Sequence, residues 1–144
     1  MPNSATDHLG QLMDRFEVRT HQRTEFIDIT RQVEEIVART RVDAGLCTIY
    51  VPHTTAACTI NEHADPDVAR DMLMEINKIV PFDDNYRHDE GNSAAHIKSS
   101  LFGVRHSVPI ENGRLMLGTW QGVFFCEFDG PRTRQVLVQI VGDR

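Results

Sequence analysis

Hydrophobic and polar residues alternate with a two-residue period in several stretches of the chain, as in half-buried β-strands. Residues 16–20 and 25–29 alternate in this way, and the polar link between them predicts a hairpin. Asn112-Gly113 predicts a second hairpin, because this dipeptide favours a two-residue turn. The other predicted strands are apolar runs bounded by turn residues: 46–51, 57–61, 106–110, 115–117, 123–128 and 135–141.

Three further stretches have the three- to four-residue apolar period of a helix. Thr30 is expected to cap the first helix and Asp65 the second, which Pro81 ends. Asn92 or Ser93 should cap the third, and Gly103 should end it. The second helix is expected to bury one apolar stripe, which consists of Val68, Met72, Leu73, Ile76 and Val80. Antiparallel strands with a few helices predict an α+β fold.

Composition narrows the class of protein. The chain has 144 residues, with 40% hydrophobic and 25% charged, and is most simply one domain spanning residues 1–144. The net charge of −6 argues against a nucleic-acid partner, which needs a basic surface. No apolar run approaches the roughly 20 residues of a membrane span, so no membrane partner is expected. Residues 1–10 are polar and expected to be loose, without the pattern of a secretory signal, and we expect a cytoplasmic protein.

The three cysteines, Cys47, Cys58 and Cys126, form no CxxC pair. Each lies in an apolar run, so we expect reduced, buried thiols. Cys58 has an alternative, because it lies close in sequence to His53. A thiolate there could act as a nucleophile or a metal ligand.

The stretch from Tyr86 to His96 concentrates imidazole, carboxylate and amide groups around a glycine. A third imidazole, His53, follows the predicted strand 46–51. Histidine both binds borderline metals and titrates near neutral pH. His53, His88 and His96 could therefore converge on a zinc-like site with a position left for water or substrate. The alternative is that they are separate polar residues, and without a compact metal motif the spacing leaves both interpretations open.

The acidic residues nearest to these histidines in sequence are Asp89 and Glu90. A carboxylate there could orient a ligating histidine, act as a general base, or hold Mg²⁺ on a phosphorylated substrate. Asp65 and Asp67 are more simply a helix cap and a first-turn charge.

The basic residues near the predicted third helix and the C-terminus are mostly expected to be solvated surface charges: Lys98, Arg105, Arg132 and Arg134. An anionic ligand would need a local positive pocket, to which the helix start at 92–93 could add donors. Trp120 lies between glycines and is expected to be a packing or interface anchor more than a ligand platform.

Seven motifs occur in order along the chain: HTTAACTINE (53–62), DPDVARDM (65–72), Tyr86-x-His88, Asn92-x-x-x-His96, SVPIENG (107–113), LGTWQG (117–122) and EFDGPRTRQVLVQIVG (127–142). Together they resemble the YjbQ family, small proteins often labelled secondary thiamine-phosphate synthase enzyme. The resemblance covers nearly everything from residue 46 to 142, and LGTWQG is its most specific part. The first 45 residues match only in general pattern.

The resemblance implies an α+β fold, a two-sheet antiparallel β-sandwich with a few flanking helices, and a homotrimer around a threefold axis. Composition points to the same assembly, since strand 123–128 is apolar on both faces and few helices are available to cover them. The resemblance also implies a pocket using His53, His88 and His96, which favours the metal interpretation. Zinc is the expected ion, with magnesium and manganese as alternatives.

From the resemblance and the grouping of histidines and acids, we expect a metal-assisted enzyme acting on a phosphorylated or heterocyclic metabolite. Its named form is thiamine-phosphate synthase, which joins a pyrimidine diphosphate to a thiazole phosphate. The expected catalytic residues are His53, His88, His96, Asp89, Glu90 and Cys58. The expected substrate contacts are Asn92, Thr54, Thr55, Arg132 and Trp120. Two alternatives stay open: a metal-dependent hydrolase of a small ester or phosphoester, and a trimeric ligand-binding or scaffold protein without catalysis.

Overall fold

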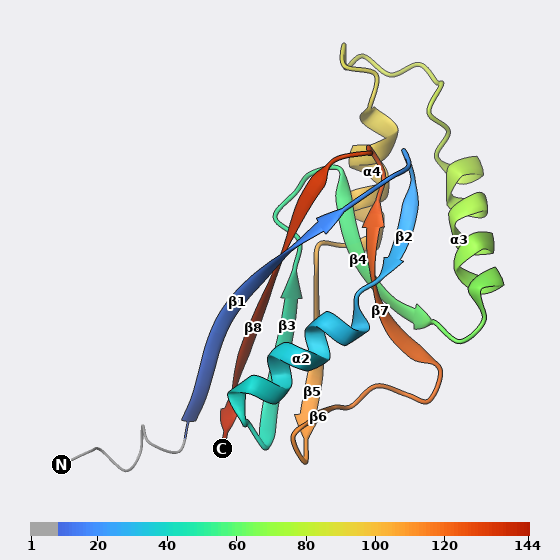
Figure 1. Ribbon diagram of the computed structural model, residues 1–144. Coiled ribbons are helices and arrows are strands. Elements are labelled where there is room, and N and C mark those ends of the chain that lie inside the picture. The colour runs from blue at the N-terminus through green and yellow to red at the C-terminus, as the bar shows by residue number, and fades with distance from the viewer. Residues whose placement is uncertain (1–8) are drawn as a thin grey trace.

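The computed structural model describes residues 9–144, in which the strands form two antiparallel sheets (Figure 1). The five-stranded sheet has the order β1 (Leu9–Arg19), β8 (Thr133–Asp143), β3 (Ala44–Tyr50), β5 (Arg105–Glu111) and β6 (Arg114–Leu115). The three-stranded sheet has the order β2 (Glu25–Asp28), β7 (Gln121–Glu127) and β4 (Ala56–Glu62). The helices of this part of the chain are α2 (Thr30–Thr40), α3 (Pro66–Ile79) and α4 (Ser93–Phe102). The predicted α+β fold with antiparallel sheets is confirmed.

The main hydrophobic core lies between the two sheets and α2. Every second residue of β8 from Val136 to Ile140 is fully buried in it, which is the alternation expected of a strand with one face covered. α2 adds its apolar face, and β7 adds Val123 and Phe125. Cys47 and Cys58 belong to this core, and all three cysteines are buried and free, as the sequence predicts.

A second hydrophobic cluster lies on the opposite face of the three-stranded sheet, against α3 and α4. Phe124, Cys126 and Phe128 supply its sheet side, where the Phe128 ring packs edge-on against Phe26 and Phe102. Both faces of β7 are therefore covered within one chain. The prediction that strand 123–128 leaves an apolar face uncovered, and so favours a trimer, is wrong for this reason.

The predicted hairpin of residues 16–20 with 25–29 is also wrong. β1 pairs along its whole length with β8, from Leu9 opposite Asp143 to Arg19 opposite Thr133. β2 pairs with β7 in the other sheet. The link between β1 and β2 thus crosses from one sheet to the other. β1 pairs with the equally long β8, and β2 pairs with the buried β7. β1 begins at Leu9, so residues 9 and 10 are not loose, and the expectation for residues 1–8 lies outside the described part.

The hairpin predicted at Asn112-Gly113 is confirmed. It joins β5 to β6, and both turn residues have positive φ, 53° and 73°, as a mirror-image turn requires. β6 ends at Leu115, two residues earlier than expected, and β7 begins at Gln121, two residues earlier.

The helix starts differ in their capping. Asp65 caps α3 as predicted, accepting a hydrogen bond from the Asp67 N–H at 2.9 Å. Thr30 is not a cap but the first helical residue, and its hydroxyl donates to Asp28 instead. Asn92 occupies the cap position of α4, but its side-chain amide donates to Asp129 and makes no hydrogen bond with the helix N–H groups. Gly103 ends α4 with φ 91°, as expected.

The outer face of the five-stranded sheet and much of α3 are exposed. Leu46 and Val141 are neighbours on β3 and β8, and each keeps over two fifths of its surface exposed. Four residues of the predicted apolar stripe of α3 are half-buried: Val68, Met72, Leu73 and Ile76. Val80, which was predicted as the fifth, follows the end of the helix and is buried. No helix in residues 9–144 combines the length and apolarity needed to cross a membrane.

Candidate functional site

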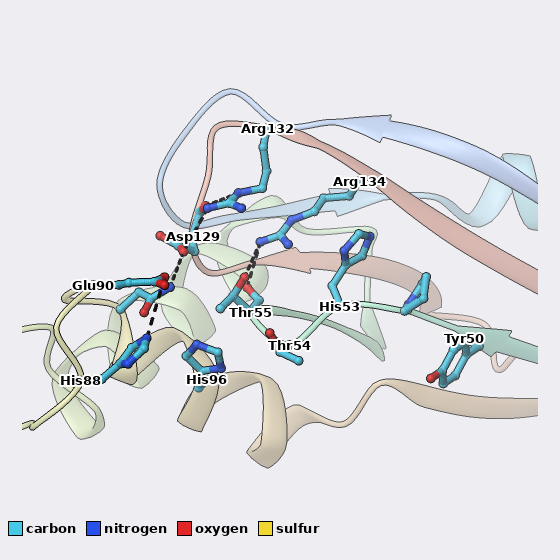
Figure 2. A pocket seen from close by; sticks show the side chains of 12 residues that line it. Tyr50, His53, Thr54, Thr55, His88, Glu90, His96, Asp129, Arg132 and Arg134 are labelled. Carbon is cyan, nitrogen blue, oxygen red and sulfur yellow. Dashed lines mark hydrogen bonds and ion pairs between the residues drawn. The ribbon is translucent and has the colours of Figure 1, made fainter.

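A cavity of about 750 Å³ opens where the turn after β3, the start of α4 and the β7–β8 connection meet (Figure 2). We call it the histidine pocket. Its lining residues are Tyr50, Pro52, His53, Thr54, Thr55, His88, Glu90, Asn92, His96, Asp129, Arg132 and Arg134. The structure therefore brings all three histidines predicted from the sequence to the wall of one cavity.

Most of the other expected site residues also line the histidine pocket. They are Thr54, Thr55, Glu90, Asn92 and Arg132. Asp89 does not line it, and Trp120 lies beyond the far end of β4, where its carbonyl accepts the His63 N–H. Neither residue is placed to contact a ligand in this pocket.

The structure argues against Cys58 as a nucleophile. Its side chain is buried in the main core and is absent from the pocket wall. Burial raises the pKa of this thiol to about 12, so the thiol stays protonated at neutral pH.

A buried ion pair supports the floor of the histidine pocket. The Arg134 guanidinium donates to both carboxylate oxygens of Glu127 and to the Thr55 hydroxyl, the last at 2.8 Å. Only 3% of Arg134 and none of Glu127 is exposed. Burial alone would raise the pKa of Glu127, but the hydrogen bonds from Arg134 and its neighbours hold that pKa below its usual value. The expectation of a solvated Arg134 is wrong.

Two signals in the sequence could have identified this pair. Arg134 falls on the buried register of β8, in phase with Val136, Val138 and Ile140. Glu127 follows the apolar run of β7 without a turn residue between them. A charge at a buried register position predicts a buried partner, because an unpaired charge there is strongly destabilising.

His53 has a defined protonation pattern. Its Nε2 accepts the backbone N–H of Gln135 at 2.9 Å, so the proton of the neutral ring is on Nδ1. Burial lowers the pKa of His53, and the nearby Arg134 guanidinium lowers it further. At neutral pH this residue is therefore a neutral imidazole with an N–H donor on Nδ1.

His88 and His96 form a second group on the other side of the histidine pocket (Figure 2). Their rings are nearly perpendicular, with centroids 5.7 Å apart. His88 Nε2 lies 3.8 Å from the Glu90 carboxylate, which is mostly exposed. His96 is in the first turn of α4, where no side chain caps the helix and no acid is present. Histidine side chains and free helix N–H groups are thus close together.

The donor set fits a three-histidine metal site poorly. His53 already uses Nε2 as a hydrogen-bond acceptor and carries its proton on Nδ1, so it offers a metal no free lone pair. Across residues 9–144, no three His, Cys, Asp or Glu side chains are arranged to hold a metal ion. Metal binding at His53, His88 and His96, with zinc, magnesium or manganese as the ion, stays a prediction.

The comparison with known proteins settles the family. The family described as UPF0047 protein YjbQ-like matches residues 14–143. The chain belongs to the YjbQ/UPF0047 family. UPF0047 protein YugU of Bacillus subtilis is 51% identical over 132 residues, which is 91% of this chain and 100% of YugU. UPF0047 protein MJ1081 of Methanocaldococcus jannaschii is 46% identical over 134 residues, covering 93% of this chain and 97% of that protein. The predicted resemblance is confirmed.

Solved structures of YjbQ/UPF0047 proteins share the fold. One from Clostridium acetobutylicum, described as an uncharacterized conserved protein of this family, superposes with a TM-score of 0.87 at 50% identity, covering 88% of this chain and 98% of that one. One from Sulfolobus solfataricus, described as a YbjQ-like protein of unknown function, gives 0.91 at 35% identity, covering 94% and 100%. These descriptions assign no reaction, so the chemistry of the histidine pocket is argued from its residues.

Proposed function

We propose that the histidine pocket binds a phosphorylated metabolite and catalyses its conversion, with histidine N–H groups as hydrogen-bond donors to the substrate and to the leaving phosphate. The observation that carries this proposal is the presence in one cavity of three histidines, two arginines and the open start of α4. Imidazole N–H groups donate hydrogen bonds, and a guanidinium group with helix N–H donors supplies an anion site.

The charges of the histidine pocket suit an anion. Among the lining residues, Arg132 is paired with Asp129 and Arg134 with the buried Glu127, so Glu90 is the one lining acid without an arginine partner, whereas the whole chain has a net charge of −6. Asp129 is held by Arg132 at 3.1 Å and by the Asn92 amide at 2.9 Å, so its charge is already paired. A phosphate therefore meets less repulsion here than over most of the surface.

The three histidines divide the work. His53 is held neutral, so its Nδ1–H donates to a substrate oxygen without adding a full charge. His88 and His96 lie beside the start of α4, where their N–H groups donate to the charge that develops on a leaving phosphate. Thr54 and Thr55 between the two groups add hydroxyl groups that orient the ligand.

Thiamine-phosphate synthesis is the named reaction to test. In it the thiazole nitrogen forms a bond to the pyrimidine methylene carbon, and pyrophosphate leaves with the electron pair of the broken C–O bond. Purified protein is assayed with both substrates, beside the variants His53→Gln, His88→Gln and His96→Gln. We expect each variant to lower kcat/KM about 100-fold, the usual effect of removing one donor to a developing negative charge. His21→Gln is the matched control, because this histidine is exposed in the β1–β2 link.

Two outcomes would reject parts of the proposal. No thiamine phosphate above the level of a triple variant, with all three pocket histidines changed to Ala, rejects the named reaction. A phosphorylated compound that binds the histidine pocket tightly and is recovered unchanged rejects catalysis and favours a ligand-binding protein. Metal analysis after incubation with zinc, manganese or magnesium tests the metal prediction separately.

A further inference from the structure

A second cavity, of about 440 Å³, lies between α3 and the three-stranded sheet. α3 runs beside this sheet (Figure 1) and contacts β2 and β4. We call it the α3 groove. It shares no lining residue with the histidine pocket. Its volume is within the range of small-molecule sites, so it can take a small ligand independently of the proposed function.

A hydrogen-bonded chain of three side chains fixes one histidine at the wall of the α3 groove. His63 Nδ1 lies 2.8 Å from Asp28 Oδ2, and the other Asp28 oxygen accepts the Thr30 N–H at 2.9 Å and the Thr30 hydroxyl. The Thr30 hydroxyl in turn accepts the backbone N–H of Val123 at 2.9 Å. An ionised carboxylate only accepts hydrogen bonds, so the His63 ring donates to Asp28 from a protonated Nδ1.

Asp28 is ionised in this arrangement. Burial raises its pKa, but the hydrogen bonds from Thr30 and His63 outweigh burial and hold that pKa below its usual value. His63 is therefore oriented by an anionic partner, and in the neutral ring the proton on Nδ1 leaves Nε2 as a lone-pair acceptor. Within residues 9–144, the hydrogen bond of the His63 ring is made by Nδ1, and Nε2 has no hydrogen-bond partner.

Gly122 leaves the space that the His63 ring occupies. A Cβ at this position would lie 2.3 Å from His63 Nδ1 and 2.4 Å from its Cγ. Any side chain there would push the ring away from Asp28. The second glycine of LGTWQG is thus required for the placement of His63, a role that the sequence alone does not reveal.

The remaining lining of the α3 groove is acidic on one side and apolar on the other. Glu25, Glu62 and Asp65 join Asp28 against a single guanidinium, Arg70. Phe26, Phe124 and Leu73 form the apolar part. Carboxylates and aromatic faces both attract an organic ammonium group, and the apolar part accepts the body of such a ligand.

We propose that the α3 groove is a binding site for a small organic amine, whose ammonium group donates a hydrogen bond to His63 Nε2. The acidic residues supply the attractive field, and Phe26 and Phe124 contact the apolar part of the amine. The α3 groove binds a cation and the histidine pocket an anion. The two sites share no lining residue, so both can be occupied at the same time.

The probe is 2-phenylethylamine, with 2-phenylethanol as its neutral counterpart, and binding is followed by NMR of the histidine side chains. We expect saturable binding of the amine that shifts the His63 resonances, with the alcohol about tenfold weaker or more, because a charge-assisted hydrogen bond is lost. Equal binding of amine and alcohol, or no binding of the amine at about 10 mM, overturns the proposal, since millimolar affinity is the weak end for small ligands.

Variants separate a ligand site from a structural His63–Asp28 pair. His63→Phe keeps an aromatic ring but removes the acceptor, and should weaken amine binding about tenfold. Gly122→Ala should do the same by displacing His63. Glu62→Gln should weaken binding by a smaller factor, while Glu35→Gln, the same change on an exposed part of α2, should have no effect. If His63→Phe fails to fold, the Glu62 and Glu35 pair still decides: equal affinities in these two variants overturn the proposal.

Discussion

Lys98 and Arg134 are both buried basic side chains, but their surroundings differ. Arg134 has the carboxylate of Glu127 as its partner. Lys98 has no exposed surface and no hydrogen-bond partner for Nζ within the described residues. Its ammonium group lies 3.8 Å from the centre of the Phe82 ring, and Arg23 contacts the same ring at 3.7 Å. A cation–π contact offsets only part of the desolvation of an ammonium group.

Lys98→Met should stabilise the protein at pH 7. Burial lowers the pKa of Lys98 from 10.5 to about 8, with the charge of Arg23 adding to the effect. Below pH 8 the folded state must hold a charged lysine that the unfolded state solvates better, which costs about 1–3 kcal/mol. Methionine keeps the apolar stem, so the free energy of unfolding should rise by about 1–2 kcal/mol in urea denaturation.

The gain from Lys98→Met should shrink as pH rises from about 8 toward 10.5. Over this range the folded wild type loses its proton before the unfolded state does, so wild-type stability increases with pH. A gain that is the same at pH 7 and pH 10, or a loss at pH 7, would show that the Phe82 contact outweighs desolvation.

At the scale of elements, the ion pair of Glu127 and Arg134 joins the two sheets beside the histidine pocket. Glu127 ends β7 in the three-stranded sheet, and Arg134 is near the start of β8 in the five-stranded sheet. Thr20, after β1, donates its hydroxyl to Glu127 at 2.9 Å. The link from β1 to β2 crosses between the sheets at this point. The ion pair therefore connects the two sheets where the chain passes from one to the other.

Arg134→Met should lower the free energy of unfolding by about 3–5 kcal/mol, because it leaves a buried carboxylate without a partner. Urea denaturation measures this loss. Adding Glu127→Leu to Arg134→Met should recover part of it, since no unpaired charge is left. Arg39→Met breaks the exposed pair with Asp14 and should change the free energy of unfolding far less than Arg134→Met does. Equal losses in the single and double variants would contradict the explanation.

At the scale of the whole molecule, the outer face of the five-stranded sheet carries exposed apolar side chains. Leu46 lies beside both Val141 and Pro109, and Tyr50 lies beside Leu137. The helices pack elsewhere, on the three-stranded sheet or between the sheets. An exposed apolar sheet face favours association, and the homotrimer implied by family resemblance stays a prediction on this new basis.

Light scattering at micromolar concentration should give three times the mass of the chain. Leu46→Asp should lower the mass toward that of one chain without loss of circular dichroism, because an interfacial carboxylate is costly to bury. Ile79→Asp is the matched control, an exposed apolar residue at the end of α3. A monomer mass for the wild type would reject the trimer, and a trimer mass for Leu46→Asp would reject this face as its interface.

The sequence by itself determined most of the strands, all three helices and the three histidines of the pocket. These follow from local physics: hydrophobic periodicity sets the element type, and Asp65, Gly103 and Asn112-Gly113 act on their own backbone neighbours. The strand partners of β1 and β2 could not be obtained this way, because pairing depends on the cover available far along the chain. The same holds for α3, whose stripe is apolar in sequence but only half-buried in the fold.

Tertiary structure alone decided which polar groups act together. Glu127, Arg134 and Thr20 become partners because the two sheets meet, and His63 gains Asp28 because β2 and β4 flank β7. It also decided that Cys58 and Lys98 are shielded from water, and that His53 directs Nε2 toward the backbone of Gln135. A residue type sets what chemistry is available, but pKa, tautomer and partner depend on neighbours that only the fold brings within a few ångströms.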